Sequence, residues 1–241
     1  MFVEIAGMPG CGKTTIFKGL STRLTPLGVA SNNINNISMH RLATDWLPRF
    51  VKGKPQRELL YRFSRFVSAH PKLVSYAERI YDKDDVKQFL FVLMCANYQA
   101  SVDLAEDGEV IFLEEGFLTH SVAASLPLAQ SKRALHGLVS KLPIVDAVVF
   151  IKTPPQVAFE RVFQRRGLRL GNKKLTDKFG GMDSFVARAD LFERGVHQYC
   201  ERGPKLIEID AAWSPQEAAD YAAKEIVAMV AESAAGETQV A

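Results

Sequence analysis

Two spacings of apolar residues divide the chain into predicted strands and helices. Residues 2–6 form a short apolar run that ends at Gly7, and from Lys13 apolar residues recur at helical spacing until Thr25. The nearly continuous apolar runs 109–113 and 144–151, with a weaker run at 206–209, are typical of strands in a parallel sheet. Helical patterns follow at about 156–166, 184–200 and 215–230. This alternation predicts an α/β layered sheet with right-handed crossovers.

The stretch between these elements is mostly helical in pattern. From about residue 56 to 106, apolar residues alternate with charged ones at helical intervals, and Pro71 and the acidic segment 82–85 are the breaks, so two or three helices fit. A second strand within 32–39 is weakly indicated, because asparagines interrupt it. No repeat or linker divides the chain, and the end after Ala231 is expected to be frayed.

Composition narrows the class of protein. Of 241 residues, 47% are hydrophobic and 24% charged, enough for a sizeable core in one domain. A net charge of +3 does not favour a nucleic-acid partner. The three cysteines lack the spacing of a metal site, no apolar run is long enough to span a membrane, and the N-terminus carries no basic leader. These features predict a cytoplasmic protein without a membrane partner.

A glycine-rich motif lies between the first predicted strand and helix. Gly7, Gly12, Lys13 and Thr14 fit G-x-x-x-x-G-K-[ST] in the strand–loop–helix context that this motif requires. Such a loop cradles phosphates with its N–H groups, the lysine reaches the β- and γ-phosphates, and the threonine hydroxyl ligates Mg²⁺. The alternative is an ordinary glycine-rich turn with a solvated lysine. We predict an ATP site at these loop residues: Gly7, Pro9, Gly10, Cys11, Gly12, Lys13, Thr14 and Thr15.

Two adjacent glutamates follow the second apolar run. Glu114 leaves the predicted strand at its C-terminal end, where ligands bind in open α/β sheets, and is predicted to hold Mg²⁺ or a metal-bound water. Glu115 is predicted to accept a proton from, or a hydrogen bond with, a phosphoryl acceptor. The two roles can be exchanged, and the pair could instead simply solvate the end of the strand.

Arginines gather near residue 165. Arg161 and Arg165 share one face of a predicted helix, whereas Arg166 is turned away. The basic, glycine-containing stretch up to about residue 183 is typical of a mobile lid whose arginines stabilise charge on a transferring phosphoryl group. A solvated basic loop is the alternative. We predict catalytic roles for Arg161 and Arg165.

On these motifs the chain resembles the P-loop nucleotide and nucleoside kinases, and their thymidylate-kinase-like branch most. The resemblance lies in the loop 7–13, the strand ending in FLEEGF (112–117), the strand–turn–helix 146–167, and the last helices and strand from Ser184 onward. It covers most of the chain outside 28–106. It implies a three-layer α/β/α parallel sheet of the P-loop kinase type, with a helical insertion at about 41–106 and a lid at about 161–183, in one domain spanning 1–231 with a tail at 232–241.

The acceptor side departs from the family pattern. Thymidylate kinases place an arginine-containing segment after their second strand, and here Arg41 and Asp45 are the nearest candidates by position. Aromatic residues of this region, among them Phe66, Tyr98 and Phe117, could line a pocket, although such spacing is more often core. Whether the acceptor is a nucleoside monophosphate therefore stays open.

The expected function is an ATP- and Mg²⁺-dependent kinase acting on a small-molecule acceptor, and the expected acceptor is a nucleoside, a nucleotide or a related metabolite. Lys13, Glu115, Arg161 and Arg165 are its predicted catalytic residues, Thr14 and Glu114 its metal ligands, and Arg41, Asp45 and Glu115 its substrate contacts. The alternative is a nucleotide-binding regulatory module or slow NTPase with no acceptor. The preference for ATP over GTP and a homodimeric state are left open.

Overall fold

A computed structural model of the chain describes residues 1–27, 29, 31–33, 54–81, 85–106, 108–114, 116–125, 131–165 and 181–238. The strands are β1 (Phe2–Ala6), β2 (Ser31–Asn33), β3 (Val110–Leu113), β4 (Ala147–Lys152) and β5 (Lys205–Asp210). The helices are α1 (Lys13–Leu24), the 3-10 turn η1 (Thr25–Leu27), α3 (Lys54–Ala69), α4 (Pro71–Tyr81), α5 (Asp85–Leu104), α6 (Phe117–Ser125), α7 (Ser131–Val139), α8 (Pro155–Arg165), α10 (Gly181–Cys200) and α11 (Pro215–Thr238).

The five strands form one parallel sheet in the order β2-β3-β1-β4-β5. Strand β1 is central, with β3 on one side and β4 on the other. The loop that follows β1 therefore lies in the middle of the row of carboxyl strand ends, where ligands bind in open α/β sheets. Val3 pairs with Phe112 of β3 and with Ala147 of β4. The register thus aligns the carboxyl ends of β1, β3 and β4 at one edge.

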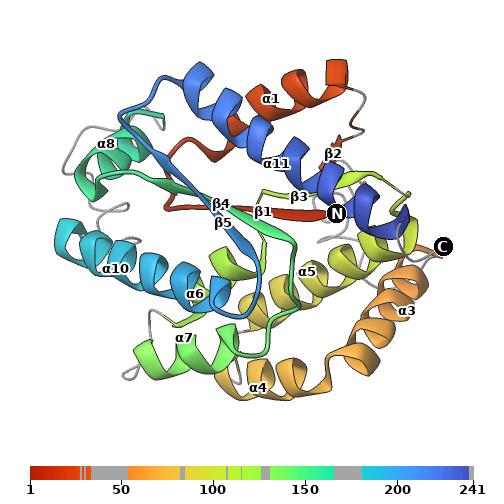
Figure 1. Ribbon diagram of the computed structural model, residues 1–241. Helices are drawn as coiled ribbons and strands as arrows, with labels where there is room; N and C mark the ends of the chain where they lie inside the picture. Colours follow the sequence, from red (N-terminus) through yellow and green to blue (C-terminus); the bar gives the residue numbers. More distant parts are fainter. Residues whose placement is uncertain are drawn as a thin grey trace.

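Helices cover both faces of the sheet and give the predicted three layers. Helices α1 and α11 lie side by side on one face, and α6, α7 and α10 lie on the other (Figure 1). The first face buries alternate strand residues such as Val3, Ile5 and Val149, and the second buries Ala6, Val148 and Phe150. This alternation across a pleated strand is what a sheet covered on both sides requires. The predicted α/β/α parallel sheet is confirmed.

Between β2 and β3, the described residues 54–81 and 85–106 form three helices, which matches the upper limit of the prediction for about 56–106. Helix α3 packs along α5, while α4 contacts α6 and α7. Phe66, Tyr98 and Phe117 are buried against one another, with ring centroids 5.3 to 6.0 Å apart. These three aromatic residues therefore form core and do not line an open pocket.

Several elements differ from the sequence prediction. Helix α11 continues to Thr238, so the segment expected to fray after Ala231 is helical as far as the structure describes it, in keeping with its alanine and glutamate content. Helices α6 and α7 lie in a segment for which no helix was predicted. Both ends of the predicted lid are helical, in α8 and α10, and residues 166–180 lie outside the described residues.

No helix in the described part of the chain combines the length and apolarity needed to cross a bilayer.

Strand β4 begins at Ala147, later than the apolar run 144–151 suggests. Ile144 is 47% exposed, and the segment before the strand is held by Tyr199 of α10. The buried Tyr199 hydroxyl donates to the Pro143 carbonyl oxygen and accepts a hydrogen bond from Val145 N at 3.0 Å. This hydroxyl satisfies two backbone groups that the sheet leaves unpaired.

We predict that Tyr199→Phe destabilises the fold by about 1 to 3 kcal/mol, because a buried carbonyl and a buried N–H lose their partner together. Urea unfolding followed by circular dichroism measures this free energy. The control Tyr221→Phe, at a partly exposed ring of α11, should cost less than about 0.5 kcal/mol. Equal effects of the two substitutions would contradict the role given to the Tyr199 hydroxyl.

Candidate active site

The loop between β1 and α1 is built for a close approach of backbone to ligand. Gly10 and Gly12 have φ of 87° and 106°, values that L-residues with side chains rarely adopt. Gly12 directly precedes α1, and within the described residues no side chain caps that helix N-terminus. The partial positive charge of the helix end therefore faces the loop, as an anion site requires.

Neighbouring elements hold this loop in place. A Cβ on Gly10 would lie 2.2 Å from the carbonyl oxygen of Ala158, so the loop backbone packs directly on α8. Thr153, just after β4, donates a hydrogen bond to the Cys11 carbonyl at 3.3 Å. The Cys11 side chain is buried, and burial raises the pKa of its thiol, although the charges of Lys13 and Arg161 oppose the shift. The Cys11 side chain is therefore a packing group of the loop, and the contact of Cys11 with ATP stays a prediction.

Lys13 lies across the loop that precedes it. Its Nζ donates to the carbonyl oxygens of Gly7, at 2.8 Å, and Met8, at 3.3 Å. The ammonium group is thus held by two neutral acceptors of the same loop. An anion with several phosphate oxygens would offer this cation stronger, charge-assisted hydrogen bonds.

Thr14 and Glu114 meet although they are 100 residues apart in sequence. The Thr14 hydroxyl at the start of α1 donates to Oε1 of Glu114, which directly follows β3. The contact joins the carboxyl ends of the adjacent strands β1 and β3. Hydroxyl and carboxylate oxygens are ligands suited to Mg²⁺, which is commonly bound by one or two protein oxygens together with phosphate and water. The residues predicted as metal ligands therefore fit that ion.

A buried carboxyl lies on β1, opposite Leu113 at the end of β3. Among the charged residues that the structure describes, Glu4 of β1 is the one that is fully buried. Its Oε1 accepts a hydrogen bond from Leu118 N, in the first turn of α6, at 2.9 Å. Burial raises the pKa of Glu4 to about 8, against the opposing effects of the backbone N–H groups of residues 117–119 and of the Lys13 charge.

A cavity of about 330 Å³ opens beside the loop. It is lined by Arg161 and Gln164 of α8, by Trp213 from the segment between β5 and α11, and by Pro215 at the start of α11. The floor includes loop residues and the ends of β4 and β5. Its size and partly apolar lining suit a flat heterocycle attached to a phosphate chain.

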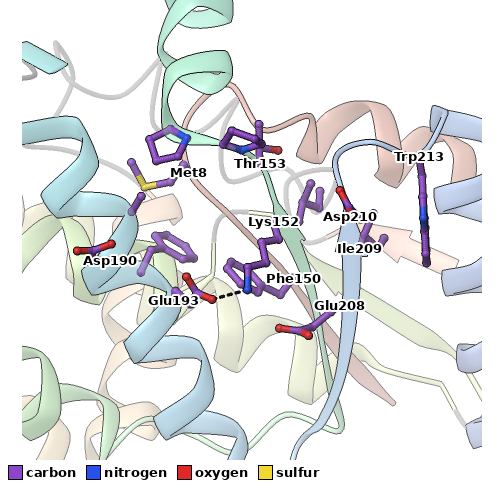
Figure 2. Close-up of a pocket in the computed structure, with 15 residues that line it drawn as sticks. Met8, Phe150, Lys152, Thr153, Asp190, Glu193, Glu208, Ile209, Asp210 and Trp213 are labelled. Atoms are coloured by element: carbon purple, nitrogen blue, oxygen red, sulfur yellow. Dashed lines mark ion pairs between the residues drawn. The ribbon is translucent and has the colours of Figure 1, made fainter. Parts of the chain in front are cut away.

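A second cavity, of about 510 Å³, lies on the α10 side of β4 and β5. Figure 2 shows Lys152 of β4 reaching to Glu193 of α10, with Glu208 and Trp213 on the β5 side. The Lys152–Glu193 ion pair is 2.5 Å long, and three more carboxylates line the cavity: Asp190, Glu208 and Asp210. Asp210 also lines the cavity beside the loop, but there Arg161 offsets its charge. The excess of negative charge in the second cavity disfavours a polyphosphate, so the cavity beside the loop is the better nucleotide site.

The described residues cover only part of the predicted site. Lys13, Thr14, Glu114 and Arg161 gather around the loop, with Arg161 lining the cavity beside it. Arg165 ends α8, but its side chain lies outside the described residues. Four further residues lie entirely outside the described part of the chain: Arg41, Asp45, Glu115 and Arg166, which follows Arg165.

Sequence reasoning did not single out Arg188 of α10. It lies one helical turn from the buried residues Phe185 and Phe192, which contact Phe159 of α8 and Phe150 of β4. Burial lowers the pKa of this guanidinium. An arginine at an otherwise apolar position of a helix is the sequence signal that could have identified it.

No protein-family model matches the sequence, and no curated protein matches it. Among solved structures, it is similar to a deoxyadenosine kinase from M. mycoides with the products dCMP and dCDP bound, at 16% identity and a TM-score of 0.50, covering 95% of this chain and 100% of that one. The same kinase with dCTP bound gives 14% identity, a TM-score of 0.49 and the same coverage. A shikimate kinase from Acinetobacter baumannii in complex with shikimate gives 14% identity and a TM-score of 0.41, covering 94% and 93%.

At these identities the similarity shows the fold alone. The parallel sheet and the similarity to the deoxyadenosine kinase structure confirm the predicted fold of the P-loop kinase type. The assignment to the thymidylate-kinase-like branch within that group stays a prediction.

Ionisation of Glu4 gives the site a testable pH signature. Between pH 4.5 and about 8 the folded protein holds a proton that an unfolded glutamate has lost, so this carboxyl stabilises the fold less as pH rises. Glu4→Gln keeps an oxygen that can accept from Leu118 and removes the ionisation. The variant should gain stability relative to the wild type by up to about 1.4 kcal/mol per pH unit in that window.

Urea unfolding between about pH 5 and pH 8.5 measures this gain. Glu106→Gln, at an exposed position before β3, is the control and should follow the wild type throughout. A difference between Glu4→Gln and wild type that stays constant across the window would contradict a protonated, buried Glu4.

Proposed function

We propose that the protein is a kinase that transfers the γ-phosphoryl group of ATP, with Mg²⁺, to a small-molecule acceptor. The observation that carries the proposal is the contact between Thr14 and Glu114 at the start of α1, next to a lysine that lies over a phosphate-type loop. A phosphate loop alone would serve any nucleotide-binding protein. A metal-type oxygen pair at the adjacent strand end adds a group suited to phosphoryl transfer.

Each described residue has a physical role in this proposal. The loop backbone and the N-terminus of α1 bind the phosphates, while Lys13 exchanges its bonds to Gly7 and Met8 for bonds to phosphate oxygens. Thr14 and Glu114 hold the metal ion or its water. Mg²⁺, when bound, supplies positive charge that offsets the charge of the phosphates.

Arg161 connects the phosphate loop with the base pocket. It lines the cavity beside the loop, and its charge acts on Cys11 within the loop. A guanidinium in this position can stack on a heterocycle or donate to a phosphate. Arg161, and Arg165 one turn further along α8, are therefore proposed to stabilise charge on the transferring group.

For the acceptor we propose a nucleoside, a nucleotide or a related metabolite. The solved kinase with the most similar fold reported above carries nucleotides, and this class comes to the present chain only as part of the proposal. Arg188 on the inward face of α10 adds a half-buried cation that suits a phosphate or another anionic group. Glu115, Arg41 and Asp45 keep their predicted acceptor roles.

A screen of ATP consumption tests this function. Purified protein with Mg²⁺ and ATP is incubated with nucleosides, nucleotides, sugars and aminoglycosides in turn, and ADP is measured. We expect consumption to depend on one acceptor class, with a phosphorylated product visible by mass spectrometry. Hydrolysis that is indifferent to every acceptor would contradict the kinase and favour the regulatory module or slow NTPase.

Lys13→Ala should lower phosphoryl transfer at least about a hundredfold, because no other side chain of the loop brings a positive charge to the phosphates. It should change the free energy of unfolding by less than about 1.5 kcal/mol, since it removes bonds to partly accessible carbonyls only. Steady-state kinetics and urea unfolding measure the two effects. Lys18→Ala, exposed on the same helix, is the control; a Lys13→Ala enzyme as active as this control would refute the site.

Glu114→Gln should weaken the response to Mg²⁺ about tenfold or more while leaving ATP binding without metal unchanged. The amide keeps one oxygen but removes the negative charge that attracts the ion. The measurement is the turnover rate as a function of free Mg²⁺ at saturating ATP. Glu109→Gln, just before the opposite end of β3, is the matched control, and identical Mg²⁺ curves for both variants would remove Glu114 from the metal site.

A further inference from the structure

Glu4 is an acid on a face of β1 that is otherwise apolar. Phe2 and Ala6, its neighbours on that face, pack into the core beneath α6 and α10, and Glu4 itself is fully buried. Burying a carboxyl group costs free energy unless it makes hydrogen bonds that a hydrophobic residue could not. Its contacts therefore identify what the acid does there.

Those contacts are made with one short segment. Glu4 accepts a hydrogen bond from Leu118 N at 2.9 Å. A side chain of β1 therefore caps the N-terminus of α6, which lies far from it in sequence. A Cβ on Gly116 would lie 2.5 Å from Cδ of Glu4 and 2.7 Å from both carboxyl oxygens. The carboxyl group thus occupies the space that any other residue at 116 would need.

This segment is the one that carries the metal-type carboxylate. Glu4 pairs with Leu113 across the sheet, and the chain runs from Leu113 through Glu114 to Gly116 before returning to the Glu4 carboxyl group at α6. The turn is therefore fixed at one end by sheet pairing and at the other by Glu4. Glu114 lies between these two fixed points and reaches Thr14.

We propose that Glu4 is a positioning residue for the metal site: by capping α6 and filling the space at Gly116, it holds the turn that presents Glu114 to Thr14. The inference rests on the proposed function for the identity of the metal site. Within the described residues the hydrogen bond and the close packing of the Glu4 carboxyl group are with Leu118 and Gly116, and its link to the phosphate loop is the charge of Lys13, so its contact with the Glu114 segment is through the turn. The length of a glutamate side chain is what allows a residue in the middle of β1 to reach the start of α6.

A double-mutant cycle between Glu4 and Gly116 tests the proposal, with Glu4→Gln as the conservative variant. The readout is the factor by which Mg²⁺ tightens ATP binding, measured by calorimetry with and without the metal. Glu4→Ala and Gly116→Ala should each reduce that factor about tenfold, as loss of an outer partner of a metal ligand does. Glu4→Gln, which still accepts from Leu118, should stay within about threefold of wild type.

The double variant distinguishes positioning from two separate defects. If Gly116 is constrained by the Glu4 carboxyl group, Gly116→Ala in the Glu4→Ala background should add less than about a twofold further effect. Amide hydrogen exchange at Leu118 should speed up in Glu4→Ala and stay slow in Glu4→Gln. Ile207→Ala, a buried truncation in β5 on the opposite face, controls for lost stability and should leave the Mg²⁺ factor unchanged.

Additive effects of the two substitutions, or a Glu4→Ala variant with the wild-type Mg²⁺ factor, would overturn the proposal. So would an equal loss in Ile207→Ala, because the effect would then follow stability alone. The readout needs no acceptor: a wild type that phosphorylates nothing in the screen would defeat the proposed kinase function while the Mg²⁺ factor still decides the role of Glu4.

Discussion

The hydrogen bond between Thr14 and Glu114 is the contact on which the rest of the site depends. It joins the first residues of α1 to the end of β3, and it exists because parallel pairing of β1 with β3 brings both carboxyl ends to one edge of the sheet. A shift of one residue in that register would turn Glu114 to the other face of the sheet. The position of the oxygen pair is therefore a consequence of sheet packing, and the chemistry proposed for it inherits the rigidity of the core.

The two cavities near this contact differ in the charge of the side chains around them. Lys13 and Arg161 lie at the loop and its cavity, whereas the cavity on the α10 side has an excess of carboxylates. A polyphosphate is attracted to the first region and repelled from the second. Glu4 adds a buried acid close beneath the loop, and its raised pKa keeps that acid largely neutral around pH 7, so it does not compete with Glu114 for the metal ion.

Local sequence signals predicted the centre of the fold well. Strand β1, the loop and α1 begin and end where Gly7, Lys13 and Thr25 indicated, because glycine and periodicity act within a few residues. The pattern also placed Glu114 after a strand and Arg161 on a helix, and both lie beside the loop, while their roles stay predictions. Long-range contacts could not be predicted. The hydrogen bond between Glu4 and Leu118 joins residues 114 positions apart, and nothing near Glu4 in the sequence indicates its partner. Helix α6 was missed because its apolar residues are not confined to one face. Helix α7 was missed although Ala134, Leu135 and Leu138 recur at helical spacing; both helices have nine residues, and packing against α10 and α4 supplies their stability.

The most direct measurement of the central claim is a crystal structure of the wild-type protein with ATP and Mn²⁺, in which anomalous scattering locates the ion. We expect phosphates on the N–H groups of the loop at 7–14 and the base against Arg161 and Trp213. We expect the ion to be bound to the Thr14 hydroxyl, with Glu114 as its ligand or as the acceptor of its water. ATP bound outside the loop, or an ion held away from Thr14 and Glu114, would contradict the central claim.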